Sequence, residues 1–335
     1  MLPEAIQPIT SLSIKNALFR SPEELLLEFY EMQNQFLYSR YKINNSMETS
    51  NILTFLGRSL HLSIVRERES HLNYDVSLNN FFFNINKNAS NSGHKIASIV
   101  STTGIPKETV RRKIKKLQER KVVDLNKKTK EYFWILKPQN KEIFIDFIEN
   151  DIKAIAKFIM AVTKLLGLNL KVKFIEEEIK TQFSFYYYHY YSCQLQWFKM
   201  WQTKIKDVDL IFIAIQALIP ALKYKKTKYT SKADENNIYS IIGKSYVSSN
   251  SKKYAISASS ISEISGIPRA TCLRKIEKLI QLGMLRKEND TKRYYINQSL
   301  SDRTRHITKK ENIDYTIQIF SEFLSIIISA LLIKK

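Results

Sequence analysis

The chain has 335 residues and carries 53 Lys and Arg against 32 Asp and Glu, which gives a formal net charge of +21. This length predicts about two domains and is sufficient to bury their cores without disulfides. Apolar residues make up 44% and charged residues 25%, a balance that excludes wholesale disorder. A positive surplus this large is typical of proteins that bind a polyanion, either nucleic acid or an anionic membrane surface.

The composition offers no sign of metal or catalytic chemistry. Two cysteines, Cys193 and Cys272, are too few for a disulfide scaffold or a Cys-rich zinc site. The five histidines lack metal-ligand spacing, so we expect no metal, no cofactor and no enzyme activity.

No basic segment typical of a signal peptide stands near the first residues. The longest apolar stretches, 210–222 and 323–333, fall short of the roughly 18 residues of a membrane span. We therefore expect a cytoplasmic, nucleoid-associated protein with no membrane partner.

The chain contains an internal repeat. Residues 96–134 align without gaps to residues 258–296 at a constant offset of 162, and 14 of the 39 aligned positions are identical. Such self-similarity indicates a duplicated structural unit. We predict a first repeat over residues 1–166 and a second over residues 167–335.

The similarity extends on both sides of the aligned segments. An aromatic helix is predicted at 25–41 and again at 183–201. Apolar helices are predicted at 143–166 and 313–333, and we expect them to pack against the aromatic helices. Three interpretations of the second aromatic helix are open: packing between the repeats or in a dimer, a pocket for an aromatic ligand, or a platform on which single-stranded bases stack.

Each aligned segment predicts two short helices followed by two strands. In the first copy, the helix that starts at Ile96 ends before Gly104, and Pro106 is expected to start the next helix. Val110, Ile114 and Leu117 then give that second helix one narrow apolar face. The strands are predicted at Val122–Leu125 and Tyr132–Leu136, with a basic turn at Asn126–Lys130 between them.

The second copy repeats this order. Gly266 and Pro268 mark the turn, and Cys272, Ile276 and Leu279 form the apolar face. Its strands are predicted at Met284–Lys287 and Lys292–Ile296. These elements predict a winged helix-turn-helix in each half, over residues 95–137 and 252–297. The expected fold class is mainly α with small β-wings: two repeated winged helix-turn-helix domains, joined and flanked by long helices.

The turn and second helix of each copy resemble those of bacterial winged-helix transcriptional regulators. Residues 104–112 read Gly-Ile-Pro-Lys-Glu-Thr-Val-Arg-Arg, and residues 266–274 read Gly-Ile-Pro-Arg-Ala-Thr-Cys-Leu-Arg. Both are similar to the MarR-like and GntR-like pattern of glycine, an aliphatic residue and then Thr-Val-x-Arg. The resemblance covers about 40 residues in each copy. It implies binding of double-stranded DNA, with the second helix as the recognition helix.

The positive charge is concentrated in the two aligned segments. Residues 95–137 hold 13 Lys or Arg and 4 Asp or Glu, and residues 252–293 hold 10 and 4. An A/T-rich genome also favours lysine, but it would spread the charge along the chain, so the clustering favours a functional basic surface. At 100° per residue, Arg112 lies opposite the apolar face of its helix, where a major groove would lie, and Arg274 occupies the matching place.

The predicted DNA-binding residues follow from this geometry. In the first copy they are Lys107, Thr109, Arg111, Arg112, Lys115 and Lys116 on the helix, and Lys127, Lys128 and Lys130 in the turn between the strands. In the second copy they are Arg269, Thr271, Arg274, Lys275 and Lys278 on the helix, and Lys292 and Arg293 in the turn. The turn residues are expected to contact phosphate or the minor groove and to set register rather than sequence.

We therefore predict a transcriptional regulator that binds double-stranded DNA through two recognition helices. One chain could act as an intramolecular pseudo-dimer, and a homodimer is also open. Leu273 and Glu277 replace Arg111 and Lys115 in the second copy, which favours an asymmetric, imperfect palindrome. Two alternatives are a plasmid-type replication initiator with tandem winged helices and a winged-helix scaffold for protein interactions.

Overall fold

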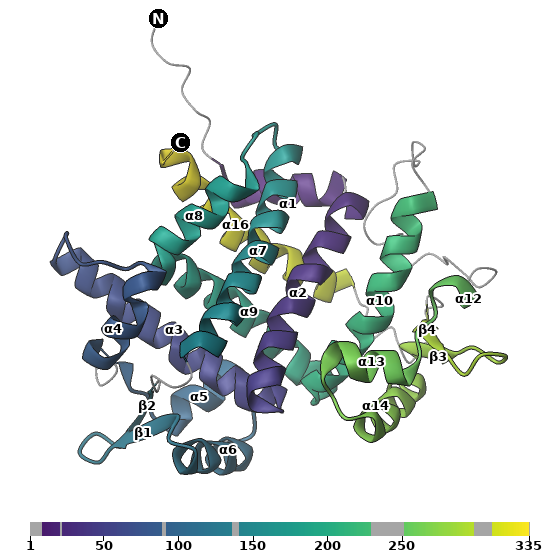
Figure 1. Ribbon diagram of the computed structural model, residues 1–335, viewed down its shortest axis with the longest axis horizontal. Coiled ribbons are helices and arrows are strands. Elements are labelled where there is room, and N and C mark those ends of the chain that lie inside the picture. Colours follow the sequence, from purple (N-terminus) through teal and green to yellow (C-terminus); the bar gives the residue numbers. More distant parts are fainter. Residues whose placement is uncertain are drawn as a thin grey trace, which may run out of the picture.

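The computed structural model describes residues 9–20, 22–88, 92–135, 141–228, 251–297 and 310–334, which form a mainly helical protein with two small antiparallel sheets (Figure 1). The first half contains α1 (Ser11–Arg20), α2 (Pro22–Asn44), α3 (Met47–Ser70), α4 (Leu78–Asn88), α5 (Ile96–Thr103), α6 (Lys107–Glu119), β1 (Val123–Asn126), β2 (Glu131–Trp134) and α7 (Lys141–Leu165). The second half contains α8 (Val172–Thr181), α9 (Phe183–Ile205), α10 (Val208–Lys228), α12 (Ser251–Tyr254), α13 (Ala258–Ser265), α14 (Arg269–Gln281), β3 (Leu285–Lys287), β4 (Tyr294–Ile296) and α16 (Lys310–Ile333).

The two segments that align in sequence contain their elements in the same order. Two helices, α5 and α6, precede the β1–β2 hairpin, and α13 and α14 precede the β3–β4 hairpin. In each segment an isolated bridge joins the residues just before the first helix to the hairpin, His94 to Tyr132 and Ile256 to Tyr294. The matching sequence positions therefore occupy matching places in the two halves.

A glycine forms the turn between the two helices of each segment. Gly104 ends α5 with a φ of 71°, and Gly266 ends α13 with the same φ. This left-handed backbone is readily adopted by glycine, which has no Cβ to clash with the carbonyl oxygen. The next residue, Ile105 or Ile267, is buried in the core. The tight turn thus fixes the angle between the helices and inserts an apolar anchor.

The boundaries of some elements differ from the prediction by one or two residues. Pro106 precedes α6 as an extended N-cap residue with a ψ of 141°, whereas the sequence placed it inside the helix. β1 begins at Val123, which pairs with Trp134 at the end of β2. Leu136, the last residue of the predicted second strand, lies outside the described residues.

Long helices pack across the boundary between the two halves. α9 packs along α3 and α5 of the first half, and α2 packs along α10 of the second. In the same way, α1 packs against α16 and α8 packs against α7. One continuous cluster of buried apolar side chains therefore includes residues of both halves.

The aromatic helix α9 fills the centre of this shared core. Tyr190 and Phe198 lie 5.4 Å and 5.8 Å from the ring of Phe36 on α2, measured between ring centroids. Gly57 of α3 permits a close approach of Tyr191, because a Cβ at this glycine would lie 3.0 Å from the ring. Of the three interpretations of this helix, packing between the repeats is confirmed.

A buried ion pair crosses the same region. The guanidinium of Arg40 on α2 pairs with the carboxylate of Asp151 on α7 and donates a hydrogen bond of 3.0 Å to the Tyr191 hydroxyl on α9. Ser39 donates a further hydrogen bond of 2.9 Å to Asp151. Paired, hydrogen-bonded charges of this kind leave little tolerance for a shift of one helix against another.

The C-terminal apolar helix packs as expected. Both α16 and α7 lie against an aromatic helix, α16 against α9 and α7 against α2. Phe323 of α16 lies 5.8 Å from Tyr190, measured between ring centroids. Among the described residues, Glu311–Ile333 is nevertheless long and apolar enough to cross a membrane, with a mean hydropathy of 2.0. The expectation from the sequence was too short because it considered only the uninterrupted apolar run at the end of the helix, residues 323–333.

His61 of α3 is buried among aromatic rings of two other helices, α4 and α9. Its imidazole stacks on Phe81 at 4.7 Å between centroids and contacts Phe183, Tyr187 and Tyr191. Within the described part of the chain, neither ring nitrogen has a hydrogen-bond partner. Burial and the nearby Arg40 guanidinium lower the pKa of His61 to about 3.

This environment predicts a specific acid sensitivity. The folded state keeps His61 neutral, whereas the unfolded chain takes up a proton below about pH 6.5. The free energy of unfolding should therefore fall as the pH drops below this value, by up to about 1.4 kcal/mol per pH unit. His61→Phe should remove this component, which urea unfolding of both proteins between pH 7 and pH 4.5 would measure. Parallel stability curves for the two proteins would contradict the prediction.

The position of α16 predicts that its removal destroys the fold. A chain that ends at residue 315 loses the buried side chains of this helix, including Phe320, Leu324, Ile327 and Leu331. The apolar faces of α1 and α9 would then be exposed to water, which destabilises the folded state by about 25 cal/mol per Å² of apolar area. We expect aggregation or loss of cooperative thermal unfolding, measured by size-exclusion chromatography and circular dichroism. A soluble, cooperatively folded truncation product would show that α16 is dispensable.

Candidate nucleic-acid interface

The helices α6 and α14 turn their apolar faces inward and most of their basic side chains outward. Val110, Ile114 and Leu117 of α6 are buried, and so are the matching Cys272, Ile276 and Leu279 of α14. Arg112 and Arg274 both lie on the exposed side. The helical periodicity therefore orients both arginines as the sequence predicted.

Most of the predicted site residues are exposed. We call the exposed basic set the basic edge; it consists of Lys107, Arg111, Arg112, Lys115, Lys116, Lys127, Lys128 and Lys130 in the first half, and Arg269, Arg274, Lys278, Lys292 and Arg293 in the second. The two predicted threonines, Thr109 and Thr271, are half-buried. Both threonines lie one residue before the first buried apolar residue of their helix.

Lys275 departs from this pattern, and its assignment to the exposed surface is wrong. Its side chain is only 11% exposed, and its ammonium lies 2.9 Å from Asp207 and 3.0 Å from Asp209. Burial alone would lower the pKa of Lys275, but the two carboxylates raise it above its usual value. The ammonium is thus charged and is held by acidic groups of its own chain.

The hairpin turns carry exposed basic side chains. Lys130 and Lys292 stand at matching places and both have a left-handed backbone, with φ of 61° and 50°. In the first turn the Asn126 side chain accepts hydrogen bonds from the backbone N–H of Lys128 at 3.0 Å and of Thr129 at 3.3 Å. This local bonding fixes the turn and leaves its lysine side chains in solvent.

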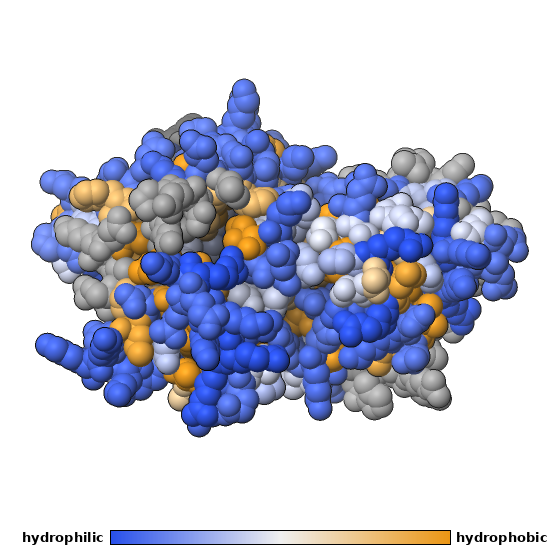
Figure 2. All heavy atoms as spheres, turned by 60° about the horizontal axis from the view of Figure 1, so that its bottom comes forward, coloured by the Kyte–Doolittle hydropathy of each residue, from blue (hydrophilic) through white to orange (hydrophobic). Residues whose placement is uncertain are grey.

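The parts of the basic edge lie on one side of the molecule. Figure 1 shows α6 and α14 along the same edge, with the two hairpins pointing away from each other. Figure 2 turns this edge forward, and hydrophilic side chains cover most of it.

Arg111 pairs with Glu108 at 2.7 Å on the surface of α6, an exposed contact that solvent and salt weaken.

Some residues near the basic edge were not singled out from the sequence. Arg120 and Lys121 at the end of α6 are exposed, as are Arg286 and Lys287 on β3. Their only signal in the sequence is their charge, since none occupies an identical position of the repeat. The acidic partners of Lys275 were missed as well, although Asp207 stands just before an apolar helix, where aspartate is a common N-cap.

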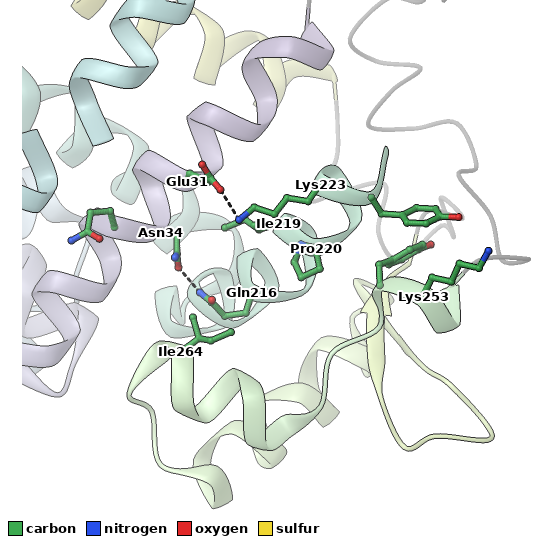
Figure 3. A pocket seen from close by; sticks show the side chains of 11 residues that line it. Glu31, Asn34, Gln216, Ile219, Pro220, Lys223, Lys253 and Ile264 are labelled. Carbon is green, nitrogen blue, oxygen red and sulfur yellow. Dashed lines mark hydrogen bonds and ion pairs between the residues drawn. The ribbon is translucent and has the colours of Figure 1, made fainter. Parts of the chain in front are cut away.

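A cavity of about 660 Å³ opens between α2, α10 and α13 (Figure 3). Its polar side chains largely pair with each other: Lys223 lies 2.8 Å from Glu31, and Gln216 donates a 2.6 Å hydrogen bond to Asn34. Ile264 of α13 closes one side. The cavity lies between α2 and the helix pair of α13 and α14, and none of its lining residues belongs to the aromatic helix α9.

Among the residues that the structure describes, no group of three or more His, Cys, Asp and Glu side chains is placed to hold a metal ion. Comparisons with protein-family models, curated proteins and solved structures found no match.

Proposed function

We propose that this protein binds double-stranded DNA in a sequence-specific manner and acts as a transcriptional regulator. In this proposal each half carries a winged helix-turn-helix, with α6 and α14 as recognition helices and the hairpins as wings. The observation that carries the proposal is that both helices expose basic side chains along one edge of the molecule. A DNA duplex carries negative phosphate charge along its whole length, so it suits a basic surface that extends over two helices.

The basic edge would supply affinity and specificity through different side chains. Arginine in the major groove can donate two hydrogen bonds to one guanine, which discriminates against a wrong base by about 1–3 kcal/mol. Arg112 and Arg274 are suited to this role because both lie on the outer face of their helix. The lysines of the hairpin turns would contact phosphate or the minor groove and orient the helices.

Two recognition helices in one chain would act as a covalent pseudo-dimer. Winged-helix proteins that bind as dimers place two such helices in successive turns of the major groove. Here the two helices differ, since Leu273 and Glu277 stand where the first copy has Arg111 and Lys115. Glu277 is exposed and Leu273 is half-buried. The expected site is therefore an imperfect palindrome whose two halves are not equivalent.

Salt dependence provides the first test. If six to ten basic side chains neutralise phosphates, affinity should fall by roughly 10³ to 10⁵ between 50 mM and 200 mM salt. Fluorescence anisotropy with a duplex selected from a random pool would measure the slope. Binding that is independent of salt, or the absence of any selected sequence, would overturn the proposed function.

The two central arginines provide a residue-level test. Arg112→Ala and Arg274→Ala should each weaken binding to the selected duplex roughly tenfold or more, the equivalent of about 1–3 kcal/mol. Both side chains are exposed, so the free energy of unfolding should change by less than about 0.5 kcal/mol. The loss of affinity should be larger for the second half in Arg274→Ala than for the first half in Arg112→Ala. Lys115 and Lys116 lie near Arg112, whereas Lys275, near Arg274, is withdrawn from the surface.

A charge-matched variant controls for the loss of one positive charge. Lys164 is exposed in the last turn of α7, which ends on the side of the molecule away from α6 and α14 (Figure 1). Lys164→Ala should leave both the affinity and the sequence preference unchanged within about twofold. Equal losses in all three variants would mean that charge alone, and not the two helices, determines binding.

A further inference from the structure

The N-terminal ends of α3 and α10 meet between the two outward-facing helices. Each end is held by a lysine at the same position of the repeat, Lys113 on α6 and Lys275 on α14. Lys113 donates a 2.7 Å hydrogen bond to the Ser46 hydroxyl, which caps α3, and lies 3.4 Å from Glu48. Lys275 makes the corresponding contacts with Asp207 and Asp209 at the start of α10.

Asp209 connects the two halves through its two carboxylate oxygens. Oδ2 lies 3.0 Å from the ammonium of Lys275, within the second half. Oδ1 accepts a hydrogen bond of 3.3 Å from the backbone N–H of Met47, the first residue of α3 in the first half. Polar contacts thus run from α14 through Asp209 to the backbone of Met47, and its chain neighbours Ser46 and Glu48 contact Lys113 on α6.

We propose that this series of contacts fixes the placement of α6 relative to α14, with Asp209 as the positioning residue that joins the halves. It rests on the proposed function in one respect: the fixed placement would set the spacing between the two half-sites of the DNA. The lysines themselves would not contact DNA, since their side chains are only 18% and 11% exposed and point to the acidic groups.

The chemistry suits a positioning role. Charged hydrogen bonds to partly buried groups are stronger and more directional than neutral ones, so they resist a tilt of the helix that carries them. Asp209 also lies at the N-terminus of a helix, where the helix dipole stabilises its negative charge. Apolar packing of α6 and α14 is less directional, so the charged hydrogen bonds add a restraint on helix orientation to it.

The placement can be measured without DNA. Spin labels on Lys115→Cys and Glu277→Cys would occupy exposed, matching positions of α6 and α14. The natural Cys193 and Cys272 are 2% and 0% exposed, so the chain without new cysteines serves as the labelling control. Pulsed electron paramagnetic resonance should give one narrow distance distribution in the parent protein, and Asp209→Ala should at least double its width.

A matched variant separates positioning from general loss of charge. Glu48 stands at the corresponding place on α3 and pairs with Lys113 of its own half, as Asp209 pairs with Lys275. Asp209 differs in that it also contacts Met47 of the other half. Glu48→Gln should keep the narrow distribution, because Lys113 retains its hydrogen bond to Ser46. Asp209→Asn, which preserves an oxygen acceptor for Met47 but loses the ion pair with Lys275, should give an intermediate width.

DNA spacing tests whether the placement is used. One base pair inserted between the half-sites rotates one relative to the other by roughly a tenth of a turn. The parent protein should prefer the selected spacing at least tenfold, and Asp209→Ala should reduce this preference below threefold. An Asp209→Ala protein that melts at a lower temperature but keeps its distance distribution and spacing preference would overturn the proposal. If the parent selects no DNA, the proposed function fails, and the distance distributions alone decide the positioning role.

Discussion

The packing of α2 and α9 across the boundary between the halves is the constraint on which the rest of the structure depends. α9 carries large rings that lie against α3 and α5 of the other half, while α2 lies against α10. The approach of Tyr191 to α3 depends on a glycine at position 57, where a side chain would meet the ring. Because each half completes its core with a helix of the other, the halves are joined by their interiors and not by a linker alone.

This shared core also determines where the basic edge lies. α3 and α10 contact α2 and α9 and, at their N-termini, hold α6 and α14 through Lys113 and Lys275. The outward helices are therefore mounted on the same elements that form the centre of the protein. A change in core packing would be transmitted to the basic edge through these contacts, since close-packed interiors transmit strain.

Charge is divided between two roles within the same short helices. The residues at positions 112 and 274 face solvent, whereas those one step further along the chain, Lys113 and Lys275, face partly buried acidic groups at the starts of α3 and α10. A rotation of 100° between consecutive helical residues is sufficient to separate them. The surplus of positive charge is thus partly structural, and the surface available to a polyanion is smaller than the composition suggests.

The sequence by itself determined the local elements. The spacing of apolar residues predicted both helix pairs, and the glycine of each turn adopts the left-handed backbone that its position requires. Arg112 and Arg274 were also correctly oriented, because they lie opposite the apolar face and no neighbouring element is needed to expose them. The repeat predicted matching elements in the two halves for the same reason: similar residues have similar local preferences.

Only the tertiary structure decided which flanks of these helices are covered. Lys275 lies about 70° from the centre of its apolar face, so periodicity leaves open whether it is exposed or buried. Its burial depends on Asp207 and Asp209, which stand at the start of α10, more than 60 residues earlier in the chain. The packing of α2 and α9 across the halves could not be predicted from the local pattern either, because an aromatic face specifies that a helix is buried but not which half covers it. Contacts between residues distant in sequence are set by the packing of the whole core, and that is where the sequence pattern ceases to predict.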